Sequence, residues 1–460
     1  AYHTNLRRSR STQFTNKEFT MTSQPPEKNP PRFALLIVFL TVFIDLLGFG
    51  IVLPVMPRQA EPYLSELGVS PIVAGGIIGI LFSVFSLMQF IFSPIWGRLS
   101  DRFGRKPLLI LSLLGSVVFY ALYGYAVSLP FDQSQLALGL MLFSRVGAGI
   151  AGASVGTAAA VIADCTTPER RARGMALIGI AFGAGFTLGP LIAYFGLIIF
   201  NERPWGVGAL ASLLSFVALL LAVFVFRETR VPGRNAAKEF FSISRTLSVL
   251  RIPAVGGLIL IYFLAIFSFA NFEATLARFT RAAFGMADDD NFLVFAAIGA
   301  VLVVAGGLYR PLAKRYSEIS LMTVGLIQMI IGLGGLAIVS WLLFQGGGGI
   351  DVTTAPNDQG GGLKTAFYIA SAFAVWGFAF VNPSVSALVS RSADSSEQGE
   401  VLGVNQSFAS LGRILGPLVG SLLFAAHSSH AMPFVVAVLT LFCVGAILMN
   451  VARSIRKLND

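Results

Sequence analysis

The stretch GRLSDRFGRK, residues 97–106, is the strongest single indicator of the fold of this chain. It stands between two long apolar runs, and it holds four cations and one carboxylate, Asp101. Gly97 and Gly104 allow a tight turn where two helices leave a membrane. Cations on both sides of Asp101 hold such a turn on the cytoplasmic side. The stretch therefore predicts a cytoplasmic connection between two transmembrane helices.

Composition also indicates a membrane protein. Of the 460 residues, 55% are hydrophobic and only 12% are charged, and the mean hydropathy is +0.76. Soluble domains carry about 25% charged residues. The apolar runs are continuous and not alternating, which favours helices over a barrel.

Twelve apolar runs have the length of about 20 residues that crosses the hydrocarbon core. We expect an all-α integral membrane protein with twelve transmembrane helices in two six-helix halves. The spans are predicted at 34–57, 70–96, 107–128, 135–160, 174–197, 206–226, 253–277, 292–312, 319–344, 365–389, 401–425 and 431–452.

The same runs predict the domain organisation. It consists of a cytoplasmic tail (1–33), an N-terminal half (34–226), a central cytoplasmic loop (227–252), a C-terminal half (253–452) and a second cytoplasmic tail (453–460). Residues 1–20 precede a methionine that is typical of a natural start, and they are left out of the fold reasoning. Within the central loop, FFSISRTLSVL predicts a short amphipathic helix on the membrane surface.

The distribution of Lys and Arg predicts the topology. With both termini in the cytoplasm and Arg310 counted with the loop 310–317, the cytoplasmic segments hold 26 of the 33 Lys and Arg residues, the external loops hold five, and two lie deeper inside spans. This split follows the positive-inside rule and accounts for the net charge of +10 without a nucleic-acid partner. The two cysteines are expected to be free thiols, no metal site is expected, and the three histidines are expected at the surface.

Charges inside spans are the first candidates for function, because each costs about 2.5–3.5 kcal/mol on insertion scales. Asp45 lies halfway along the first span, where a carboxyl group can link protonation to conformation. Arg145 opens a glycine-lined face of the fourth span, and Glu273 lies on an aromatic face of the seventh. The alternatives are a structural hydrogen bond for Asp45, a structural pair with Asp45 or a carbonyl for Arg145, and a solvated rim for Glu273.

Polar and aromatic residues in other spans are candidates for lining a substrate cavity. They are Gln89, Gln328, Trp376, Asn382, Asn405 and Gln406. For each of them an interhelical hydrogen bond or ordinary packing is the alternative. The eleventh span also carries Arg413, a fourth charge within the membrane.

Several motifs resemble those of the major facilitator superfamily. GRLSDRFGRK resembles the signature between the second and third helices of that family, and the pattern that begins at Asp45 resembles the first helix of its drug/proton antiporters. Arg145 with its following glycines resembles the family's fourth-helix motif. GFTLGP, with Gly185, Gly189 and Pro190, resembles the fifth-helix antiporter motif. That motif usually continues with two glycines, which this chain replaces by alanine and tyrosine.

The resemblance implies roles for these residues. Asp45, Arg145 and Glu273 are expected to couple transport to protons. A cytoplasmic gate is expected from Gly97, Asp101, Arg102, Gly104, Arg105, Lys106, Gly185, Gly189 and Pro190. The charged loop 164–173 is expected to join Asp101 and Arg105 in a latch that shuts the cytoplasmic side, with topology anchoring as the alternative. GFTLGPLIAYF at 185–195 also resembles GRILGPLVGSLLF at 412–424, which predicts an internal repeat.

The implied function is secondary active transport in a bacterial inner membrane: proton-coupled efflux of small amphipathic compounds by a monomer, similar to tetracycline resistance. The proton gradient would supply the energy, with no cofactor. Tetracycline itself fits less well than hydrophobic or cationic drugs, because the predicted third, eighth and ninth spans lack Asp, Glu and His. The alternative is a proton symporter or facilitator for a sugar or organic acid. No ATP-binding motif and no catalytic set appear, so an enzyme is not expected.

Overall fold

The computed structural model describes residues 34–165, 181, 184–185, 188–229, 243–252, 254–345, 361–392 and 398–459. Its regular structure in these ranges is helical, and ten helices are long and apolar enough to cross a membrane. The predicted all-α membrane fold is confirmed. The first and fifth predicted spans appear in these ranges in part as shorter apolar helices, Leu35–Ile44 and Leu188–Ile199.

The helices follow the predicted order of spans. The N-terminal half contains α1 (Ala34–Glu66), α2 (Pro71–Phe103), α3 (Arg105–Ala126), the 3-10 turn η1 (Phe131–Gln133), α4 (Ser134–Ala151), η2 (Gly152–Ser154), α5 (Val155–Cys165) and α7 (Gly206–Phe224). The fourth span is the run of α4, η2 and α5. The remaining helices are α8 (Ile243–Arg251), α9 (Val255–Phe284), α10 (Asp288–Leu312), α11 (Glu318–Gln345), α12 (Gly361–Arg391), α13 (Gln398–Ala426) and α14 (Met432–Asn459).

Several helices extend past the apolar runs that predicted them. Helix α1 continues to Glu66 through three prolines, and α9 continues to Phe284, where Gly285 ends it in the left-handed conformation with φ 62°. Hydropathy marks the extent of the membrane, whereas a cap marks the end of a helix. Helices α1 and α9 therefore extend beyond the predicted spans that end at 57 and 277.

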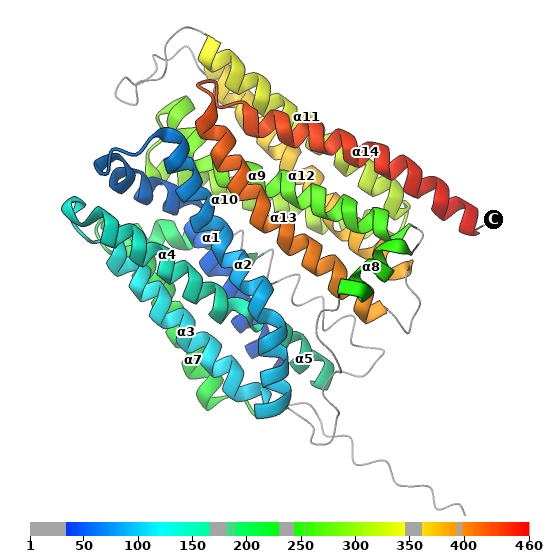
Figure 1. Cartoon of the computed structure of the whole chain (residues 1–460), viewed down its shortest axis with the longest axis horizontal. Helices are drawn as coiled ribbons and strands as arrows, with labels where there is room; N and C mark the ends of the chain where they lie inside the picture. The colour runs from blue at the N-terminus through cyan, green and yellow to red at the C-terminus, as the bar shows by residue number, and fades with distance from the viewer. Residues whose placement is uncertain are drawn as a thin grey trace, which may run out of the picture.

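The two halves pack against each other mainly through α2 and α13. Figure 1 shows α2, in blue, beside α13, in orange, at the centre of the bundle. A Cβ atom on Gly75 would lie 2.6 Å from the carbonyl oxygen of Ser421, and one on Gly79 would lie 2.9 Å from the Cα of Leu418. The GxxxG spacing thus lets the two backbones touch. Sequence reasoning overlooked this pair, although the spacing is visible in AGGIIG.

The predicted internal repeat has a counterpart in packing. A Cβ atom on Gly189 would lie 2.6 Å from the carbonyl carbon of Gly50, so the fifth span crosses the first backbone to backbone. Gly416 occupies the equivalent place in the second repeat, and its Cβ would lie 2.7 Å from the carbonyl oxygen of Phe267 in α9. In each half, a glycine of the LGP sequence packs the fifth helix on the first.

The predicted amphipathic segment of the central loop forms α8, which packs against α9 and α13. Its nine residues place Leu247 at the surface and bury Val249. The helix is thus attached to the C-terminal half.

Candidate functional site

Arg145 is enclosed inside the N-terminal half. Its side chain is among the largest fully buried ones, and its Cζ lies 4.4 Å from the centre of the Phe85 ring in α2. Nε donates a long hydrogen bond of 3.4 Å to the carbonyl of Leu81. Nη1 and Nη2 are buried and have no hydrogen-bond partner in the described part of the chain. The guanidinium therefore retains donor capacity for a carboxylate or another anion.

Asp45 lies within α1, but its side chain is outside the part of the structure that is described. Its pairing with Arg145 and its role in proton coupling stay predictions.

A second cluster of polar groups lies in the C-terminal half, on α9, α12 and α13. The hydroxyl of Tyr262 donates to Oδ1 of Asn382 at 2.7 Å. Arg413 is close enough to interact electrostatically with both Tyr262 and Glu273. We call Glu273, Arg413, Tyr262 and Asn382 the acid–arginine cluster. It places a carboxylate and a cation together within the membrane, where each reduces the cost of burying the other.

Glu273 is partly buried among apolar side chains between α9 and α10. A cavity of about 20 Å³, the room of a single water molecule, lies beside it. The walls are Phe269, Phe272, Leu276, Phe295, Ile298, Gly299 and Leu302. Helix α9 continues 11 residues beyond Glu273, to Phe284. The choice between a solvated rim and a coupling role stays a prediction.

An aromatic pair adjoins Glu273. The rings of Phe269 in α9 and Phe378 in α12 are parallel, with centroids 3.9 Å apart. Phe269 therefore belongs both to the wall of the Glu273 cavity and to the contact between α9 and α12.

The candidate cavity residues fall into two groups. Gln89 donates to the carbonyl of Gly152 at 3.0 Å, and Trp376 packs with Phe380 at a ring distance of 6.4 Å, so both have the structural contacts of the alternative interpretation. Asn405 and Gln328 instead each have a buried side-chain oxygen with no hydrogen-bond partner in the described residues. Gln406 is exposed near the N-terminal end of α13. Only Asn382 joins the acid–arginine cluster.

The charged turn between α2 and α3 is organised around Arg105. Its guanidinium pairs with Asp101 at 2.5 Å and with Asp164 of α5 at 3.1 Å, and it donates to Ser100 Oγ at 2.6 Å. These contacts join three helices of the N-terminal half. The expected latch that shuts the cytoplasmic side stays a prediction, and residues 166–173 of its loop lie outside the described residues.

Glu228 completes this cluster, and sequence reasoning missed it. Its carboxylate accepts from the backbone N–H of Arg105 at 2.9 Å and of Lys106 at 3.1 Å. A carboxylate at a helix N-terminus satisfies unpaired donors and complements the helix dipole. The only sequence signal was an acidic residue directly after the sixth span, among basic ones.

The two glycines of GRLSDRFGRK differ in role. Gly104 has φ 105°, and a Cβ there would meet the carboxylate of Glu228. Gly97 lies inside α2, and a Cβ there would meet nothing within 4 Å. The prediction that both glycines form the turn is wrong for Gly97, because the helix continues to Phe103. Lys106 donates from Nζ to the carbonyl of Val223 at 2.8 Å, whereas Arg102 is exposed.

Contacts between the halves gather at the end that the Lys/Arg distribution assigns to the outside. Arg58 of α1 donates to the carbonyl of Met286 at 2.7 Å, and Arg278 of α9 pairs with Glu61 of α1 at 2.9 Å. Asn291 of α10 donates to the carbonyl of Pro54 at 3.1 Å. These contacts join the two halves at that end.

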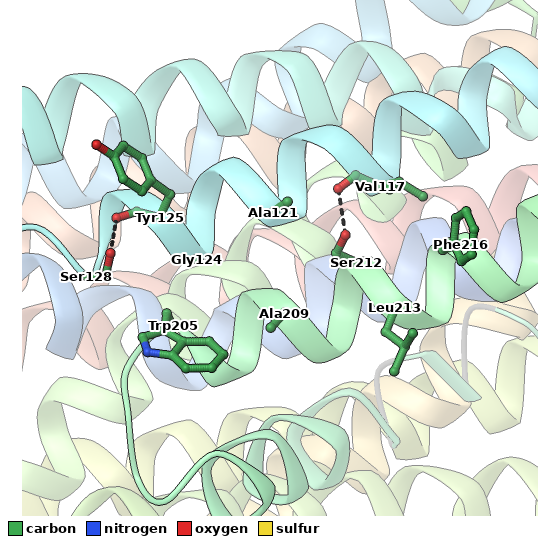
Figure 2. A pocket seen from close by; sticks show the side chains of 10 residues that line it. All are labelled: Val117, Ala121, Gly124, Tyr125, Ser128, Trp205, Ala209, Ser212, Leu213 and Phe216. Atoms are coloured by element: carbon green, nitrogen blue, oxygen red, sulfur yellow. Dashed lines mark hydrogen bonds between the residues drawn. The ribbon is translucent and has the colours of Figure 1, made fainter.

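A groove of about 680 Å³ lies elsewhere, between α3 and α7 (Figure 2). Its floor includes Ala121, Gly124 and Ala209, and Ser212 donates to the carbonyl of Val117 across it at 2.8 Å. Leu213 and Phe216, on its rim, are about half exposed. The groove contains none of the predicted site residues, and its apolar lining suits contact with lipid.

Comparison with known proteins identifies the family. The sequence model of the protein family described as Major Facilitator Superfamily matches residues 38–355 and 359–459 of this chain. The chain belongs to the major facilitator superfamily. It is therefore a multi-pass membrane transporter of small molecules and not an enzyme.

Individual relatives extend this result. Major facilitator superfamily domain-containing protein 10 of Mus musculus is 28% identical over 452 residues, covering 88% of this chain and 90% of the relative. The class B tetracycline resistance protein of Escherichia coli is 28% identical over 405 residues, covering 86% and 89%. The resemblance to the tetracycline-resistance group is confirmed.

Solved structures agree on the fold. The human organic anion transporter MFSD10 (TETRAN) has a TM-score of 0.60 at 25% identity, covering 92% of this chain and 100% of that one. A D-xylose-proton symporter has a TM-score of 0.68 at 15% identity, covering 88% and 96%. The second likeness concerns the fold alone.

Proposed function

We propose that this transporter is a proton-coupled antiporter that exports small amphipathic compounds. The observation that carries the proposal is Glu273, a carboxylate partly buried among apolar side chains, with Arg413 as its charged partner. A carboxyl group in such a site is stable in either protonation state only if the surroundings adjust. Proton binding there can therefore be linked to conformation.

The crossing of the fifth span over the first supports the gating part of the proposal. Gly189 and Gly50 touch backbone to backbone, so movement of either helix displaces the other. Asp45 lies five residues before Gly50 on the same helix. We propose that this contact links protonation of Asp45 to the gate.

Organic anions are a second candidate for the substrate class. Arg145 has two buried nitrogens without a partner in the described residues, and Arg413 adds another cation within the spans. A carboxylate substrate would supply the hydrogen-bond acceptors that Arg145 lacks. The related human protein is titled an organic anion transporter. We infer that an anionic head group fits better than the cationic drugs expected from the sequence.

The remaining parts of the proposal are topology and assembly. Both termini face the cytoplasm because 26 of the 33 Lys and Arg residues then lie on that side. The transporter acts as a monomer. Relatives occur in mouse and in Escherichia coli, so placement in a bacterial inner membrane rests on the tetracycline-resistance resemblance.

Proton release from inside-out vesicles tests the function. The vesicles are energised to be acid inside, and a hydrophobic aryl carboxylate, a lipophilic ammonium, tetracycline or xylose is added. We expect the carboxylate to release protons with the wild type and with Asp132→Asn, an exposed carboxylate control on η1. We expect no release with Glu273→Gln.

The other outcomes are equally informative. Proton movement driven only by xylose would replace the exporter with a symporter. Release by the ammonium alone would overturn the anionic substrate class. Equal release from Glu273→Gln and the wild type would remove Glu273 from proton coupling.

A further inference from the structure

His430 is not the surface histidine that the sequence predicts. It lies in the turn between α13 and α14. Of the two histidines in the described ranges, His427, three residues earlier, is the one that is exposed as expected. The imidazole of His430 stacks on the ring of Phe424, with centroids 4.2 Å apart and an angle of 10°. Phe344 of α11 packs edge-on against it at 4.9 Å. The imidazole is thus held between two aromatic rings.

The backbone also fixes this position. Nδ1 of His430 lies 2.7 Å from the carbonyl oxygen of Phe424, so the neutral imidazole donates its Nδ1–H to that carbonyl. The residue has φ 51°, a conformation that non-glycine residues adopt at a cost of about 1–3 kcal/mol. The stack and the hydrogen bond must offset that cost.

The ring of Phe424 connects His430 with the external closure. Cζ of Arg278 lies 4.7 Å from the centre of this ring, and Arg278 Nε pairs with Glu61 of α1 at 2.9 Å. Nη1 of Arg281 lies 3.8 Å from the same carboxylate. One path of contacts therefore runs from His430 through Phe424 and Arg278 to the opposite half of the molecule.

We propose that His430 is a positioning residue for the external closure: while neutral, it holds Phe424 and thereby Arg278 in place, and acid outside the membrane releases that hold. Protonation would put a second cation against the ring that already carries Arg278. The stack would then be lost, and Arg278 would no longer be held toward Glu61.

The charged groups around the imidazole give the sign of this effect. Burial lowers the pKa of His430, and Arg278 of α9 and His427 of the same turn also lower it. The bond to the Phe424 carbonyl and the more remote Glu61 of α1 act in the opposite direction. Elements α11 and α13 contribute the aromatic rings. The packed position is therefore favoured above the ordinary histidine pKa of about 6.5 and is lost as the pH falls below it.

A distance measurement tests the proposal without any substrate, so its result is separate from that of the proposed function. Spin labels on cysteines at Ser65 and Ala287, both exposed at the external end, report closure in the full chain in lipid nanodiscs. Cys165 and Cys443 are first replaced by serine. The expected change depends on how much lower the pKa of His430 is in the closed state than in the open state. For each unit of that difference, the ratio of open to closed states rises by up to about tenfold between pH 7.5 and pH 5.

Three variants decide the outcome. His430→Phe keeps an aromatic ring that cannot be protonated, and we expect it to stay closed at both pH values. His430→Ala removes the stack, and we expect it to be more open at pH 7.5. His427→Gln, in the same turn, should keep the dependence of the wild type. The proposal is overturned if the wild-type distances do not change with pH, or if His430→Phe changes as much as the wild type.

Discussion

Replacing Arg145 by methionine should make the substrate-free transporter more stable while it abolishes transport. Two buried nitrogens of Arg145 have no hydrogen-bond partner in the described residues. Each unsatisfied donor costs about 1–3 kcal/mol. The cation–π contact with Phe85, at 4.4 Å, offsets about 0.5–2 kcal/mol of this. Two such donors cost about 2–6 kcal/mol in total, so Arg145→Met should stabilise the protein by up to about 5.5 kcal/mol.

Thermal unfolding in detergent without substrate measures this effect. A gain of 1 kcal/mol raises the Tm of a unit of 150–250 residues by about 2–4 °C. Arg413→Met is the matched control, because Arg413 interacts with Glu273 and its removal leaves that carboxylate uncompensated. We expect the two substitutions to shift the Tm in opposite directions.

A fall in Tm with Arg145→Met would refute the reasoning, because it would show that Arg145 has a strong partner. Asp45 would then be the first candidate. Asp45→Asn should in that case also lower the Tm, and the double variant should lose less than the sum of the two single losses.

Three further predictions concern glycines and the carboxylate at the cytoplasmic turn. Gly104→Ala should lower the free energy of unfolding by about 1–2 kcal/mol or more, because residue 104 has φ 105° and the methyl group would meet Glu228. Gly97→Ala, the control, should leave the free energy of unfolding unchanged or raise it slightly. Glu228→Gln should cost about 0.5–2 kcal/mol as a weakened helix cap, and a Tm equal to that of the wild type would contradict the capping role. Gly189→Val should have its main effect on the initial transport rate in vesicles and a smaller effect on the Tm, because the side chain would force the fifth span away from Gly50. An unchanged initial rate would exclude that contact from gating.

The sequence predicted the helices well and their ends poorly. Apolar runs of about 20 residues locate the spans, because the membrane requires that length. The external part of α9 was missed because Arg278 and Arg281 interrupt the apolar run, although both lie within the helix.

Site residues could be predicted where a single residue carries the signal. Charges within spans, such as Arg145 and Glu273, are visible because they are costly. Partners are not visible: Glu228 caps a helix that begins 123 residues earlier, and nothing in their spacing indicates it. Gly97 and Gly104 look alike in the sequence, and only backbone conformation separates them.

The anchoring of Glu228 also limits how far the two halves can travel. The chain is fixed to the N-terminal half at Glu228 and to the C-terminal half at α8, and 14 residues, 229–242, lie between them. Fully extended, that length reaches at most about 50 Å. The central loop thus sets an upper limit on the distance between the two halves at this end of the molecule. Shortening it residue by residue would measure how much separation the transport cycle requires.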